Sequence, residues 1–230
     1  MDRREFLKAG ICLLPAVMVL QGCAGPAKYD FAKYGEIRRL GVLEFSSTEI
    51  EFWADIDRSS NMYSSAGANS SKAGRFEKSL RHDLEGFYSK MLAAAASTLE
   101  GRNIRTQMIP VPRTAEGRAA ANYRDINEPL LLECKAYIGF VLVNDGSIMP
   151  SVTAFSRLVG TDGSTRFEKH LCIGYGKNFL TESEVIAMPT MRYESEAYIN
   201  SHPEKVASDL IGIGEYLGKT IGQMMVATGA

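Results

Sequence analysis

The segment 151–176 carries the strongest constraint on the fold, because it specifies a β-hairpin together with its register. Two stretches with alternating apolar residues, 151–160 and 165–176, flank the turn Thr161-Asp162-Gly163-Ser164. A two-residue Asp-Gly loop fixes the pairing of the flanking strands. Thr161 then faces Ser164, and Arg157 faces Glu168, where we expect a cross-strand ion pair. In the same register, the apolar residues Val152, Ala154 and Leu158 face Ile173, Leu171 and Phe167, respectively.

A third strand precedes this hairpin. Residues 129–143 alternate, and Asn144-Asp145-Gly146 is a turn signal, so a three-stranded meander is expected. One face of this strand carries Leu132, Cys134, Ala136, Ile138, Phe140 and Leu142. Cys172 lies opposite Thr153 on the other face of the meander. Because a disulfide needs Cα atoms within about 7 Å, we expect Cys134 and Cys172 to be free thiols.

Two segments have the apolar spacing of amphipathic helices. Residues 75–99 place Phe76, Leu80, Leu84, Phe87, Met91, Ala95 and Leu99 on one face. The second helix is expected to start at Ser201-His202-Pro203-Glu204, a capping box with proline in the first turn. Its apolar stripe is Val206, Leu210, Ile213, Leu217, Ile221 and Met224.

Glycines recur every four residues on this second helix, at Gly214, Gly218 and Gly222. Each glycine costs about 1 kcal/mol in a helix relative to alanine, so the repeat requires an explanation. One interpretation is close packing on the sheet or on the first helix. The other is a contact between subunits, which makes these glycines a candidate interface. A transmembrane helix-pairing motif is disfavoured, since Glu215 and Lys219 interrupt a run that is too short.

The other segments complete an α+β domain. Residues 37–45, 49–56 and 103–111 are expected to be strands, whereas 57–74, rich in Ser, Asn, Gly and Ala, is expected to be a mobile loop. Residues 177–200 are also expected to be a loop. The prediction is a single domain over 37–230, with a mixed sheet of about five or six strands and two long helices packed on one face.

The first 22 residues have the organisation of an export signal. An apolar run of ten residues, Ile11–Leu20, follows a basic head and is far shorter than the roughly 20 residues of a membrane span. Arg3-Arg4-Glu5-Phe6-Leu7-Lys8 resembles the Arg-Arg-x-Phe-Leu-Lys consensus of twin-arginine signals. This resemblance implies export of an already folded chain.

The signal ends in Leu20-Gln21-Gly22-Cys23, which resembles the lipobox of bacterial lipoproteins. In that family the chain is cut before the cysteine, which carries three acyl chains, enough for stable anchoring without a membrane span. Residues 1–22 are therefore the expected signal, and 23–36 the lipidated Cys23 and a tether. Ala24 stands where aspartate retains lipoproteins in the inner membrane, so an outer-membrane lipoprotein facing the periplasm is expected.

Charge and motifs exclude several classes of function. The signal takes three basic and two acidic residues from totals of 26 and 27, which leaves a mature chain with 23 basic and 25 acidic residues. That balance does not favour nucleic-acid binding. The histidines His82, His170 and His202 have no partner at ligand spacing and are expected on the surface. We find no catalytic motif, and expect neither a cofactor nor a metal ion.

The opening strand 37–45, the helix after it and the segment 98–109 resemble the first β–α–β unit of the TolB N-terminal and CsgG-like α/β fold. The whole mature chain is similar to uncharacterised proteobacterial lipoproteins, through the segments 130–143, 150–164 and 191–210. This pattern-level resemblance spans residues 37–226 and implies a mixed sheet with both helices on one face. Fold resemblance alone does not define function.

Three functions are compatible with these features. The first is a membrane-anchored lipoprotein with a non-enzymatic binding or assembly role in the cell envelope, where a protein partner is expected. The second is a subunit of an oligomeric secretion or channel assembly, as the CsgG likeness implies, with the glycine stripe and residues 57–74 as contact surfaces. The third is an enzyme whose site no linear motif reveals.

Overall fold

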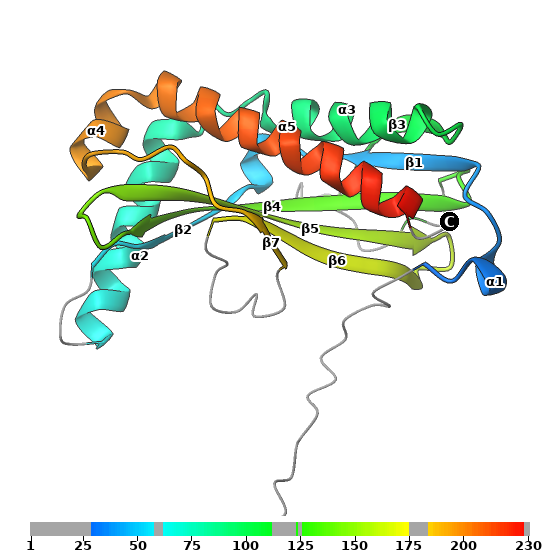
Figure 1. Ribbon diagram of the computed structural model, residues 1–230, viewed down its shortest axis with the longest axis horizontal. Coiled ribbons are helices and arrows are strands. Elements are labelled where there is room, and N and C mark those ends of the chain that lie inside the picture. Colours follow the sequence, from blue (N-terminus) through cyan, green and yellow to red (C-terminus); the bar gives the residue numbers. More distant parts are fainter. Residues whose placement is uncertain (1–28, 58–61, 112–122, 124–125, 175–183, 228–230) are drawn as a thin grey trace, which may run out of the picture.

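A computed structural model describes residues 29–57, 62–111, 123, 126–174 and 184–227 (Figure 1). The export signal, the lipobox and Cys23 lie outside the described residues. The predicted α+β architecture is confirmed, with a mixed sheet and helices packed on one face.

The sheet has seven strands in the described part of the chain. Their order is β3-β1-β4-β5-β6-β7, and β2 also pairs with β4. The strands are β1 Arg39–Glu44, β2 Glu51–Asp55, β3 Arg105–Pro110, β4 Leu130–Leu142, β5 Ile148–Gly160, β6 Thr165–Ile173 and β7 Glu184–Ala187. The pairs β4–β5 and β5–β6 are antiparallel, and the others are parallel.

The β5–β6 hairpin has the predicted register from Val152 opposite Ile173 to Leu158 opposite Phe167, beyond which a bulge shifts the pairing. At the turn, Gly163 has a φ of +79°, a conformation that glycine adopts without strain. The Asp162 carboxylate accepts the Ser164 backbone N–H at 3.0 Å and thereby closes the turn. Cys134 and Cys172 are both buried free thiols, as predicted.

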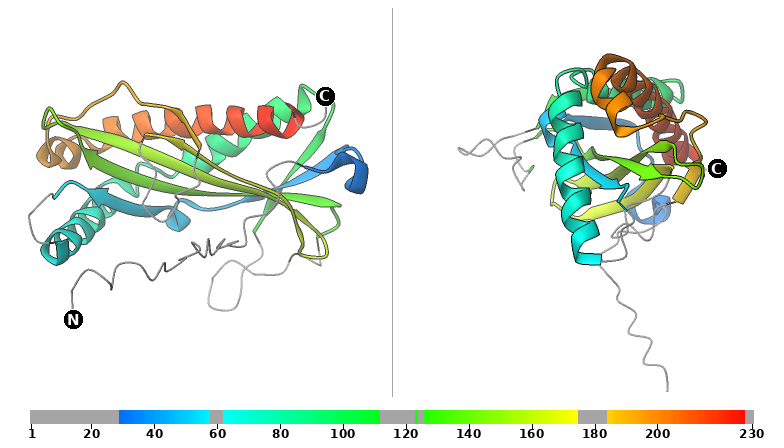
Figure 2. Two further views of the ribbon diagram at one scale, coloured as in Figure 1. Left: turned by 60° about the horizontal axis from the view of Figure 1, so that its bottom comes forward. Right: turned by 90° about the vertical axis from the view of Figure 1, so that its left-hand side faces the viewer.

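The helices differ more from the expectation. They are α1 Phe31–Tyr34, a 3-10 turn η1 at Ser47–Glu49, α2 Met62–Leu80, α3 Phe87–Glu100, α4 Glu196–Ser201 and α5 Pro203–Ala227. Helices α3 and α5 lie side by side over one face of the sheet, while α2 crosses one end of it (Figures 1 and 2). Helix α3 packs on β1 and β3, and α5 packs on β5 and β6.

The prediction of a mobile loop over 57–74 is wrong, because most of that segment belongs to α2. Its composition disfavours a helix, but tertiary contacts override this local propensity. Phe76 is fully buried, with its ring centroid 4.6 Å from that of Phe140 on β4. The Asn69 amide oxygen accepts the backbone N–H groups of Ile56 and Asp57, and so ties the helix to the end of β2.

The single helix predicted over 75–99 is divided in two. A turn at residues 81–86 separates α2 from α3, although Leu84 within the turn and Phe87 just after it are both fully buried. The change of direction lets α2 pack on β2 while α3 lies along β1 and β3, which one straight helix could not do.

The predicted start of the last helix also differs. Ser201 ends the short helix α4, which Ser195 caps by accepting the Tyr198 backbone N–H at 3.1 Å. Helix α5 begins at Pro203, whose missing N–H is harmless in a first turn.

Candidate functional site

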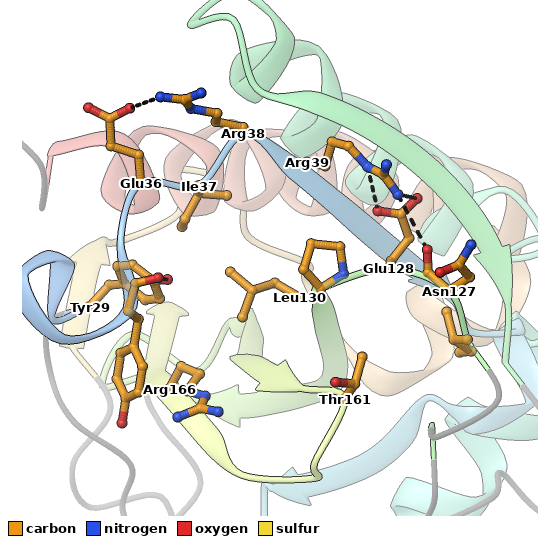
Figure 3. Close-up of a pocket in the computed structure, with 13 residues that line it drawn as sticks. Tyr29, Glu36, Ile37, Arg38, Arg39, Asn127, Glu128, Leu130, Thr161 and Arg166 are labelled. Atoms are coloured by element: carbon orange, nitrogen blue, oxygen red, sulfur yellow. Dashed lines mark hydrogen bonds and ion pairs between the residues drawn. The ribbon is translucent and has the colours of Figure 1, made fainter.

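A pocket of about 530 Å³ opens at one end of the sheet, next to α1 (Figure 3). Strand pairing brings its walls together. Because β1 and β4 are parallel, they begin at the same edge, and the antiparallel β5 ends there beside the start of β6. Thirteen of the described residues line the pocket: Tyr29, Tyr34, Glu36, Ile37, Arg38, Arg39, Ile126, Asn127, Glu128, Pro129, Leu130, Thr161 and Arg166.

One wall is an ion pair between Arg39 at the start of β1 and Glu128 just before β4. The Arg39 guanidinium donates to both carboxylate oxygens, at 3.2 and 2.9 Å, and also to the Asn127 carbonyl oxygen at 3.3 Å. The Glu128 side chain is only 10% exposed, whereas that of Arg39 is 52% exposed. The two-point contact holds the arginine at the pocket wall with part of its guanidinium in solvent.

The opposite wall is built around Arg166 on β6. Its guanidinium donates to the Asp162 carboxylate at 2.8 Å and lies 4.2 Å from the ring centroid of Tyr34. Hydrogen bonding and positive charge from Lys33, and then from Arg166, lower the pKa of Tyr34. Gly160 makes room for this pair, since a Cβ there would lie 2.6 Å from Asp162 Oδ1.

The floor between the two walls is apolar. Tyr29, Ile37 and Leu130 are all buried in the hydrophobic core, and Figure 3 shows Ile37 and Leu130 between the arginines. Burial raises the pKa of the Tyr29 phenol, which stays neutral at physiological pH. Residues 29–36, expected to be tether, therefore form part of the domain.

This arrangement is suited to binding. The charged groups that line the pocket are arginines and glutamates, and neither cysteine nor histidine is among the lining residues. Guanidinium groups on the rim and an apolar floor together match a ligand with an anionic and an apolar part.

A second group of charges lies on another part of the sheet. Glu133 on β4, with a side chain only 1% exposed, accepts Arg157 Nε at 2.6 Å and has Lys135 Nζ 3.3 Å away. Arg157 lies opposite Glu168 as predicted, but its ion pair is with Glu133 on the other neighbouring strand. Burial beside Glu133 raises the pKa of Tyr123 to about 12. The carboxylate and its cations compensate one another, which is a structural arrangement.

The histidines occupy three different environments. His82 is exposed beside Glu85, and His202 is exposed with its ring stacked on Tyr198. His170 is less exposed than expected, because its ring packs on Phe155 with centroids 4.6 Å apart. In the described residues, no group of three or more His, Cys, Asp or Glu could hold a metal ion.

The glycine stripe faces α3 of the same chain. A Cβ at Gly218 would overlap the carbonyl oxygen of Met91, and one at Gly222 would lie 2.8 Å from that of Ala95. At Gly214 it would lie 2.8 Å from the Phe87 ring. All three glycines are buried. The interpretation as a subunit interface is therefore wrong, because α3 already occupies that surface.

The pocket was missed at the sequence level. Arg39, Glu128 and Arg166 carry no common motif and meet only through strand pairing. The adjacent Arg38 and Arg39 at the start of an apolar strand were the one local signal.

The predicted lipidation site Cys23, the export residues Arg3, Arg4, Phe6, Leu7 and Lys8, and the lipobox residues Leu20, Gln21 and Gly22 lie outside the described residues. Within the described part of the chain, none of the helices has the length and apolar character to cross a membrane. Comparison with protein-family models, curated proteins and solved structures found no match. The likeness to the CsgG-like fold and to proteobacterial lipoproteins stays a prediction.

Proposed function

We propose that this protein is a membrane-anchored lipoprotein of the cell envelope, held by Cys23 and facing the periplasm, with a non-enzymatic binding role. One observation carries the binding role: the pocket with arginine walls includes Tyr29, six residues after Cys23. The anchor is supported by the twin-arginine pattern and by Leu20-Gln21-Gly22-Cys23 after an apolar run of signal-peptide length.

The short chain between anchor and domain limits where the pocket can lie. Six Cα-to-Cα steps join Cys23 to Tyr29, which span about 20 Å at full extension. Tyr29 itself lines the pocket. A lipid on Cys23 would therefore keep the pocket close to the membrane surface, where lipid headgroups and anchored proteins are its most concentrated neighbours.

Lipidation is tested by growing cells with an alkyne-tagged fatty acid and comparing Cys23→Ser with Cys12→Ser. We expect label on the wild-type chain and on Cys12→Ser, and none on Cys23→Ser. Mass spectrometry of the mature chain should show an acylated residue 23 at its N-terminus. Label that persists in Cys23→Ser, or a mature chain that starts elsewhere, would contradict the proposal.

Location is tested with two further variants. The double change Arg3→Lys, Arg4→Lys should leave unprocessed chain in the cytoplasm, because the twin-arginine pair is read as an address. The wild-type protein should sediment with outer-membrane vesicles, and Ala24→Asp should move it to the inner membrane. Turnover of any envelope substrate by the purified protein would argue against the non-enzymatic role.

A further inference from the structure

We propose that the pocket between α1 and the start of β1, β4 and β6 binds the phosphate-bearing headgroup of an anionic membrane lipid. The Arg166 guanidinium binds the phosphate, Arg38 and Arg39 elsewhere on the pocket wall contribute positive charge, and the apolar floor takes the first carbons of the lipid. This inference names a ligand for the proposed function and rests on it for the supply of lipid, but its chemistry can be tested without the anchor.

The arginines have donors to spare. Arg39 uses Nε and Nη2 on Glu128 and Asn127, and Arg166 uses Nη2 on Asp162. Within the described residues, neither Nη1 of Arg39 nor Nη1 of Arg166 donates a hydrogen bond. Guanidinium groups bind phosphate oxygens in two-point contacts, and the carboxylates already bonded to them hold them in position.

The pocket combines cations with nearby carboxylates. Among the described residues, three arginines and two glutamates line it, and Asp162, which is bonded to Arg166, brings the carboxylates to three. The buried Glu128 carboxylate is occupied by Arg39, so it presents little free negative charge. The pair of Arg38 with Glu36 is highly exposed, and such pairs contribute little and open easily. The cations Lys33 and Arg166 also lower the pKa of the Tyr34 phenol at one wall of the pocket.

The shape favours an amphiphile over a free ion. About 530 Å³ lies in the range of pockets for small organic ligands. Tyr29, Ile37 and Leu130 form an apolar floor that can contact the hydrocarbon part of a ligand. Figure 3 shows the arginines at the sides of this floor. A phosphate with an adjoining glycerol and the start of an acyl chain presents both parts.

The test uses the mature chain from residue 23 with Cys23→Ser, so that no lipid anchor contributes. Co-sedimentation should show binding to vesicles that contain phosphatidylglycerol and little binding to vesicles of phosphatidylcholine alone. Arg166→Gln should weaken binding at least tenfold. Arg102→Gln, which removes an equally charged, exposed arginine of the α3–β3 loop outside the pocket, should change binding by no more than twofold.

Circular dichroism melting curves establish that the variants fold. If Arg166→Gln is unfolded, Arg38→Gln takes its place, because that side chain is exposed and is expected to weaken binding with no loss of stability. Equal losses in Arg102→Gln and the pocket variants would show general surface electrostatics and overturn the proposal, as would equal binding to both vesicles. Displacement from vesicles by millimolar inorganic phosphate would overturn the lipid as the source and assign the pocket to free phosphate.

The experiments distinguish failure of the headgroup proposal from failure of the lipid-anchor proposal. Loss of fatty-acid label tests Cys23 alone, while vesicle binding by the unlipidated chain tests the pocket alone. A chain that carries lipid but shows no preference for anionic vesicles would keep the lipoprotein proposal and remove the headgroup site.

Discussion

The hydroxyl oxygen of Tyr88 accepts the backbone N–H of Ala136 at 2.9 Å, where β4 changes partners along one edge. Strand β1 pairs with Leu131 and Leu132 of β4, and β2 pairs from Tyr137 onward, so the edge between them has no strand partner in the described residues. A fully buried side chain from α3 thus completes the hydrogen bonding of the sheet.

Removal of that hydroxyl should destabilise the domain. Tyr88→Phe keeps the ring but leaves a buried N–H without an acceptor, at a cost of about 1–3 kcal/mol in the free energy of unfolding. Tyr216→Phe is the matched control, because that side chain on α5 is 53% exposed, and little change is expected. Urea denaturation of both variants provides the comparison. Equal stabilities would mean that water replaces the hydroxyl.

Two glycines on α5 should respond in opposite ways to a methyl group. Gly218→Ala forces α3 and α5 apart, since its Cβ would overlap the Met91 carbonyl, and should cost roughly 1–3 kcal/mol. A Cβ at Gly212 on the same helix would point into open space, with no neighbouring side chain within 4 Å. Gly212→Ala should therefore stabilise by about 0.5–1 kcal/mol through helix propensity. Thermal melts measure both, and stabilisation by both changes would refute the close packing.

The buried carboxylate of Glu133 should depend on Arg157. Among the cations of the described residues, Arg157→Met leaves Glu133 with the partly exposed Lys135, and a loss of about 3 kcal/mol is expected, at the lower end for a broken buried pair. Arg38→Met breaks an exposed pair and should change stability by well under 1 kcal/mol. Chemical denaturation at pH 7 compares the two. The double variant Arg157→Met, Glu133→Leu should recover stability, because it removes the uncompensated charge.

Stability should decline in alkaline solution. The pKa of Tyr123 is raised from 10.0 to about 12, so between these pH values the folded state retains a proton that the unfolded state releases. This contribution is complete below pH 10 and is lost as the pH rises through 12. The slope of unfolding free energy against pH over 10–12 should be shallower in Tyr123→Phe. An unchanged slope would exclude Tyr123 as a contributor.

Neither buried thiol should react in the folded chain. Cys134 and Cys172 are both fully buried, and burial raises the pKa of the Cys134 thiol, which disfavours the reactive thiolate. In the mature Cys23→Ser chain, a thiol-specific disulfide reagent should modify neither cysteine while the chain is folded. After denaturation with urea it should modify both. Rapid modification of one equivalent in buffer would show that the sheet opens locally around that cysteine.

Parts of this fold were accessible from local patterns. The β5–β6 register follows from one Asp-Gly turn and from alternation, and both are properties of residues adjacent in sequence. The buried stripe of α5 follows from helical spacing, with Met225 rather than Met224 at its end. Over 57–74 the local pattern failed, since Asn69 gains its hydrogen-bond partners from Ile56 and Asp57 at the end of β2, and Phe76, further along α2, packs on Phe140 of β4.

Local patterns in the chain were enough to specify the strands of the meander, the two free thiols and the apolar faces of the long helices. The export-and-lipidation pattern at the N-terminus stays a prediction. Tertiary packing decided between the two interpretations of the α5 glycines, which pack on α3. Two relationships came from tertiary packing alone: Arg157 pairs with Glu133, and Arg39 and Arg166 stand on opposite walls of one pocket. The two groups differ in range. Turns and helical faces depend on residues a few positions apart, whereas the pocket depends on which strands lie parallel at one edge of the sheet.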